Sequence, residues 1–69
     1  MQRQIVDALM HDAESKINLA RMNIQVLLTN PVGVGDHPNI TETIQEQLDI
    51  ISKHKDRLNV LMEYYYDED

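Results

Sequence analysis

Three side chains near the start of the chain have the residue types that bind metal ions. Asp7, His11 and Glu14 are spaced by four and three residues, which places them on one face of a helix. Carboxylates and imidazoles are ligands for zinc and related ions, and His54 would lie near Glu14 if a second helix ran back along the first. The chain lacks the spaced histidine pair or Glu-x-x-His motif of helical metal sites. We therefore expect a solvated polar face, with no metal and no other cofactor.

A glycine-containing turn at Gly33, Val34 and Gly35 has the composition of a phosphate-binding turn before a helix. No strand pattern precedes this turn, Pro38 stands where a third glycine belongs, and Asp36 would repel an anion. No serine and histidine have the spacing of a nucleophile and its base, and so short a chain does not enclose a sizeable cleft. We expect an ordinary turn between helices and no enzymatic activity.

The composition argues against several other classes of function. The chain has 69 residues, a formal net charge of −6, no cysteine, and three aromatic residues that are all tyrosines. The missing cysteines rule out disulfides and thiolate chemistry. The negative charge argues against binding to nucleic acid or to anionic membranes. No apolar run approaches the ~20 residues of a membrane span, and the first residues lack the apolar core of a signal peptide. We expect a cytoplasmic protein.

The first part of the chain has an apolar residue at every third or fourth position, which predicts an amphipathic helix. This helix should run from residue 2 to residue 29, because Pro31 pushes Asn30 out of the helical region. Ala13 and Ala20 are seven residues apart among larger residues, so they should let a neighbouring helix approach closely. The predicted seam consists of Val6, Met10, Ala13, Ile17, Ala20, Ile24 and Leu27.

Residues 30–38 contain both glycines and both prolines, which predicts the loop that reverses the chain. Gly33 and Gly35 can take positive φ at the reversal, and we expect Val32 and Val34 to fold back over the end of the helix pair. The second helix should span residues 39–65, followed by an acidic tail at 66–69. Its start is capped either by Asn39 together with Glu42 or by Asp36. The whole chain forms one domain.

The second helix carries an apolar stripe with the same spacing, formed by Ile40, Ile44, Gln47, Ile51, His54, Leu58, Leu61 and Tyr65. A reversal near Val34 sets the register between the stripes. It pairs Ile24 with Ile44, Ile17 with Ile51, Met10 with Leu58, and Val6 with Leu61 or Met62. In the same register Ala20 faces Gln47 or Leu48, and Ala13 faces His54 or Lys55.

Two polar residues, Gln47 and His54, interrupt this stripe one heptad apart. In one interpretation they lie at the margin of the seam, with their polar ends in water. In the other they meet their symmetry mates across a dimer and fix its register. The run from Tyr64 to Tyr66 also has two interpretations. It is the end of an amphipathic helix, or it belongs to a tail from Tyr64 to Asp69 that binds a partner protein or is swapped between chains.

A second apolar series, Leu19, Met22 and Val26, lies opposite the seam on the first helix. One partner helix from the same chain covers only one side, so we expect contacts with another copy. The predicted self-association residues are Leu19, Met22, Val26, Gln47, Ile50, His54, Leu61 and Tyr64. The predicted fold is all-α: an antiparallel two-helix hairpin that self-associates into a four-helix bundle or larger helical oligomer.

The loop at residues 30–38, followed by Ile40, Glu42 and Ile44 and later by Leu58, Leu61 and Tyr65, resembles small helical-hairpin proteins of T-even-like tailed phages of marine bacteria. The resemblance implies a phage accessory protein in the host cytoplasm and transfers no functional residue. We expect a non-enzymatic, homo-oligomeric interaction or assembly protein. The alternative is a small acidic inhibitor that binds a host enzyme and presents carboxylates in place of nucleic-acid phosphates. Basic residues interrupt the acids, which weighs against mimicry: Arg3, Lys16, Arg21, Lys53, Lys55 and Arg57.

Overall fold

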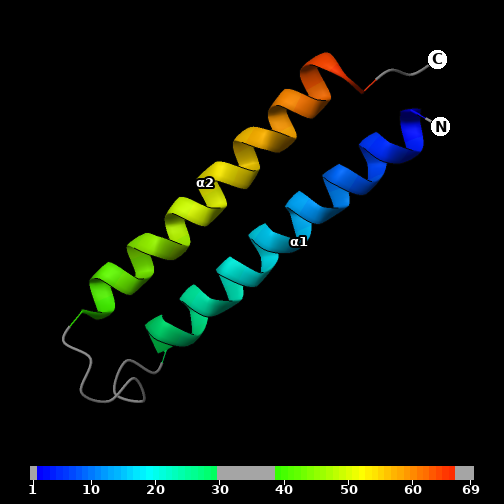
Figure 1. The fold of residues 1–69 in the computed structure, drawn as a ribbon. Helices are drawn as coiled ribbons and strands as arrows, with labels where there is room; N and C mark the ends of the chain where they lie inside the picture. Colours follow the sequence, from blue (N-terminus) through cyan, green and yellow to red (C-terminus); the bar gives the residue numbers. More distant parts are fainter. Residues whose placement is uncertain (1, 30–38, 67–69) are drawn as a thin grey trace.

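The computed structural model describes residues 2–29 and 39–66, which form two α-helices. Helix α1 spans Gln2–Thr29 and helix α2 spans Ile40–Tyr64. They lie side by side in opposite directions, so that the start of α1 and the end of α2 share one end of the molecule, the open end of the hairpin (Figure 1). The predicted antiparallel helical hairpin is confirmed. The turn at residues 30–38, including Gly33, Gly35 and the fold-back of Val32 and Val34, lies outside the described residues.

The core of the hairpin is small and lies along the predicted seam. Ala13 is fully buried, with an exposed fraction of 0%, and the other buried apolar residues are Val6, Ala20 and Leu61. Full burial of a large aliphatic side chain is worth roughly 1.5–3 kcal/mol, and only two of these four residues are larger than alanine. The larger seam residues Met10, Ile17, Ile24 and Leu27 are half-buried, because one neighbouring helix covers only part of each side chain.

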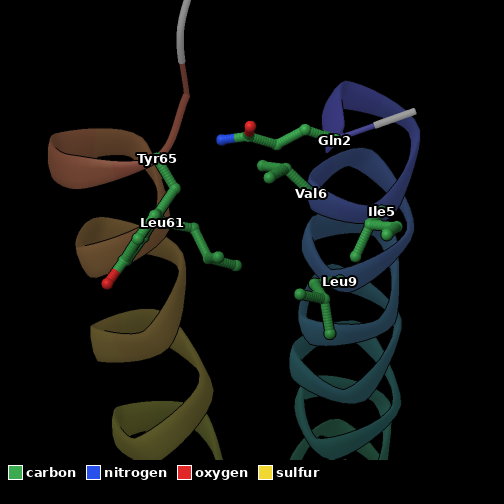
Figure 2. Close-up of a pocket in the computed structure, with 6 residues that line it drawn as sticks. All are labelled: Gln2, Ile5, Val6, Leu9, Leu61 and Tyr65. Atoms are coloured by element: carbon green, nitrogen blue, oxygen red, sulfur yellow. The ribbon is translucent and has the colours of Figure 1, made fainter.

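Contacts between the helices agree with the predicted register at two levels. Near the open end, Val6 and Leu61 point toward each other between the helices (Figure 2). Nearer the loop, Ala20 and Gln47 line one groove, and the amide nitrogen of Asn23 donates a hydrogen bond to Oε1 of Gln47 at 3.2 Å. These contacts set the levels at which residues of α1 and α2 meet.

The start of helix α2 lacks the side-chain cap that one of the two predicted alternatives gave to Asn39. Asn39 is the N-cap of α2, but its side chain makes no capping hydrogen bond, so the predicted capping by its side chain is wrong. Its ψ of 48° departs from the extended backbone that directs a cap side chain at the first-turn N–H groups. The Asn39 carbonyl instead accepts hydrogen bonds from the backbone N–H and the hydroxyl of Thr43, at 3.0 and 3.1 Å. The alternative cap, Asp36, lies outside the described residues.

At the C-terminal ends, backbone carbonyls find partners close by. The Thr29 hydroxyl donates to the carbonyl of Gln25 at 2.8 Å and approaches that of Val26 at 3.3 Å. The backbone N–H of Tyr65 donates to the carbonyl of Leu61 at 2.9 Å, just beyond the last residue of α2. These bonds satisfy carbonyl groups that have no partner farther along the helix.

Candidate self-association face

Five of the eight predicted self-association residues lie on the outside of the hairpin. Leu19, Met22 and Val26 have exposed fractions of 60%, 65% and 62%, and Ile50 and Tyr64 are also exposed. Soluble proteins rarely leave several large apolar side chains together in water without a binding role. The hairpin alone therefore leaves the second apolar series of α1 uncovered.

Two of the eight are buried inside the hairpin. Leu61, with an exposed fraction of 9%, packs against Val6, and His54 is only 6% exposed. Both belong to the stripe of α2 that faces α1, and the small side chains of Ala13 and Ala20 leave room there for a large ring. His54 thus lies inside the seam and not at its margin.

Gln47, the eighth residue, is half-buried at the edge of the seam. Its side-chain oxygen accepts the hydrogen bond from Asn23, whose side chain is exposed. Gln47 therefore occupies the marginal position that one of the two interpretations gave to both polar residues.

Two grooves run along the line where the helices meet. The middle groove has a volume of about 280 Å³ and is lined by Lys16, Leu19, Ala20, Asn23, Gln47, Ile50 and His54. The end groove has a volume of about 450 Å³ and is lined by Gln2, Ile5, Val6, Leu9, Leu61 and Tyr65. In Figure 2 Val6 and Leu61 form the floor of the end groove, while Ile5 and Leu9 stand on its α1 side.

The two grooves open on the same side of the hairpin, as residue spacing shows. Ile5, Leu19 and Val26 are separated by 14 and 7 residues, and such intervals return to nearly the same side of a helix. Ile50 and Tyr64 on α2 are likewise 14 residues apart. We call this side the groove face; its exposed apolar residues are Ile5, Leu9, Leu19, Val26, Ile50 and Tyr64. Met22 lies at its edge, next to Leu19.

Sequence reasoning missed the contribution of Ile5 and Leu9 to this face. Their exposed fractions are 58% and 46%, and both line the end groove. The spacing of Ile5 from Leu19 and Val26 was the available signal. Charged residues between these positions obscured the pattern, because Asp12 occupies the place seven residues after Ile5.

Charged side chains cross the middle of the groove face. Lys16 Nζ donates a hydrogen bond to Asp12 Oδ2 at 3.0 Å, and this bond lowers the pKa of the Asp12 carboxyl from its ordinary value of 3.8. The positive charge of Arg57 on α2 also lowers the pKa of Asp12, which places the two residues near the same level of the hairpin. Both members of the ion pair are about half exposed, so the pair contributes little to stability.

His54 is buried close to these charged side chains. Burial lowers the pKa of the imidazole from its ordinary value of 6.5, and the neighbouring Arg57, Lys16 and Lys53 lower it further, while Asp12 acts in the opposite direction. Its Nδ1 atom is buried and has no hydrogen-bond partner among the described residues. A buried polar atom without a partner destabilises the fold, and a charged ring at this place would be more costly.

The candidate metal ligands are not brought together. Asp7 lies 3.6 Å from Nε of Arg3, and His54 lies inside the hairpin near Asp12 and Lys16. Across residues 2–29 and 39–66, no group of three or more histidine, aspartate or glutamate side chains is arranged to hold a metal ion. Within that part of the chain the structure offers no metal centre.

The tyrosine run packs on the start of α1. The Arg3 guanidinium carbon lies 4.2 Å from the centroid of the Tyr66 ring, and Nη2 of Arg3 donates a hydrogen bond to the Tyr66 hydroxyl at 2.7 Å. Tyr65 lines the end groove, and its ring is tilted by 59° against that of Tyr64. Tyr64 and Tyr65 therefore lie on the groove face, whereas Tyr66 packs on Arg3.

Comparison of the chain with protein-family models, with curated proteins and with solved structures finds no match. Neither of the two described helices combines the length and hydropathy that crossing a bilayer requires.

Proposed function

We propose that this protein is a non-enzymatic assembly module, in which the groove face of one hairpin packs against a second copy to form a four-helix bundle. The observation that carries the proposal is the exposure of Leu19, Met22 and Val26, each more than half accessible to solvent. Bundles of this kind bury such stripes between facing helices. The proposal includes larger helical oligomers that form through the same groove face.

The small core supports self-association on energetic grounds. A single core in a chain of 69 residues rarely supplies more than about 3–5 kcal/mol, and the buried apolar residues here include two alanines. Burial of Leu19 and Val26 adds roughly 1.5–3 kcal/mol for each side chain that is fully covered. A second copy therefore provides apolar burial that the hairpin lacks.

The groove face argues against the alternative of an acidic inhibitor that mimics nucleic acid. Lys16 lines the middle groove, and the charges of Lys53 and Arg57 act on His54 in the same groove. The surroundings of this groove are therefore not a continuous acidic surface. The resemblance to phage helical-hairpin proteins is compatible with assembly, and we propose an accessory role in the cytoplasm of an infected host.

Light scattering coupled to size-exclusion chromatography tests the proposal. We expect the protein to have at least twice the 8.0 kDa mass of one chain, and Leu19→Lys to reduce the mass to one chain while circular dichroism still shows helix. Leu48→Lys is the matched control. Leu48 is also exposed. It precedes Ile50 by two positions, which is a rotation of about 200° around the helix. Leu48 therefore lies away from the groove face, and the Leu48→Lys variant should keep the assembly.

A mass of one chain for the unaltered protein would overturn the proposal. Equal dissociation of the Leu19→Lys and Leu48→Lys variants would show that the groove face is not the contact surface.

A further inference from the structure

His54 is the one buried polar side chain among the described residues. It lies in the seam, where the register sets it opposite Ala13, and it lines the middle groove together with Ala20. The imidazole therefore fills the space that the two alanines leave between the helices. With Nδ1 buried and unpartnered, the neutral ring fits this place better than the charged ring.

The charged groups around His54 add to this preference. Those that act on it from α1 are Asp12 and Lys16, and those from its own helix are Lys53 and Arg57. Three of these four groups are basic, and the carboxylate of Asp12 is already bonded to Lys16. A proton on His54 would thus add a positive charge to a buried position whose charged neighbours are mostly basic.

We propose that proton uptake by His54 opens the helix pair in mild acid and so disperses the assembly built on the groove face. The expected change in oligomer mass rests on the proposed function, whereas the expected opening of the hairpin does not. The connection is structural, because His54 lines the middle groove beside Leu19 and Ile50, and these two residues belong to the contact surface of the proposed assembly. Separation of the helices removes the surface that the two chains share.

The direction of the pH effect follows from linkage. The pKa of His54 is lower in the folded chain than its ordinary value of 6.5. The stability that the neutral ring supports is thus fully present above pH 6.5. It is lost as the pH falls from there through the folded-state pKa, because the unfolded chain binds the proton first. From pH 8 to pH 5 the ratio of folded to unfolded chains falls by up to about 30-fold.

The test uses a chain in which His54 is the single imidazole. The sequence has three histidines, so His11→Gln and His37→Gln together leave His54 alone. In this background we would compare His54 with His54→Leu and His54→Gln, two replacements that do not titrate and that differ in polarity. The second replacement keeps the test usable if the first alters packing.

Three measurements are made between pH 8 and pH 5, above the range in which ordinary carboxylates titrate. Urea unfolding followed by circular dichroism gives the folding equilibrium, light scattering gives the mass, and NMR gives the pKa of the single imidazole. We expect the single-histidine chain to lose stability and mass together as the pH falls. Both His54 variants should change much less, and the imidazole should titrate below pH 6.5.

A folded-state pKa at or above 6.5, or an equal acid response in the chains without His54, would overturn the inference. An oligomer that keeps its mass at pH 5 while the single-histidine chain loses stability would overturn the dispersal. A mass of one chain already at pH 8 would refute the proposed function instead. In that case, acid unfolding that depends on His54 would still support the switch within the hairpin.

Discussion

The close approach of the two helices at Ala13 can be tested by introducing a larger side chain at this position. Ala13 is fully buried at the seam, where the register sets it opposite His54. The substitution Ala13→Leu adds three carbon atoms at a place without free space, and overpacking of this kind costs typically about 1–3 kcal/mol. The change in helix propensity is small beside this cost, because leucine is nearly as good a helix former as alanine.

This cost is large relative to the stability of the molecule. A core of this size supplies about 3–5 kcal/mol, so Ala13→Leu should remove between a fifth and all of it. With a urea dependence of about 1 kcal/mol per molar for a small protein, the unfolding midpoint should fall by about 1–3 M. All samples need the same chain concentration, because association contributes to apparent stability.

Ala8→Leu is the matched control for this experiment. Ala8 lies on the same helix but is exposed, so the same change in volume should lower stability by no more than about 0.5 kcal/mol. Urea unfolding is followed by circular dichroism for both variants. An Ala13→Leu midpoint equal to or above that of the unaltered protein would refute the close approach, since it would mean that the helices leave room at this level.

Two surface interactions give smaller effects. Arg3→Gln removes both contacts to Tyr66 and should cost up to about 1 kcal/mol, seen as a lower thermal midpoint and shifted Tyr66 ring resonances; unchanged resonances would contradict this packing. Asp12→Asn removes the ion pair with Lys16 and should leave the midpoint at pH 7 unchanged, because both side chains are half exposed. The pKa of Asp12 lies below 3.8, so its contribution is present above pH 3.8 and is lost as the pH falls further. A clear loss at pH 7 would contradict this reasoning.

The hairpin and the levels of its two helices were predictable from the sequence because one physical rule governs both stripes. Apolar residues at intervals of three and four fix the side on which each helix meets its neighbour. The position of the turn then fixes which residues meet. Val6 opposite Leu61, and Ala20 beside Gln47, follow from these two facts without any knowledge of side-chain conformation.

The burial of His54 was not predictable by the same rule, although the register set it or Lys55 opposite Ala13. Periodicity put it in the stripe, but its polarity suggested the margin or a contact between copies. In the structure His54 is buried within the hairpin, as are Ala13 and Ala20 of the opposite helix, whose small side chains leave space for a ring. Capping by Asn39 failed for a different reason: residue type favours the position, whereas the backbone angles decide whether the side chain reaches the first turn.

The positions of the small residues and of the large exposed residues lead to one interpretation. Ala13 and Ala20 are buried between the helices, yet the side chain buried opposite them is an imidazole with an unpartnered nitrogen, which adds little stability. The large aliphatic side chains of Leu19, Val26 and Ile50 lie instead on the groove face. The seam therefore determines how the two helices meet, and the exposed apolar side chains of the groove face belong to the proposed contact between copies. Folding and assembly should consequently be coupled, and a change in the charge of His54 should affect both.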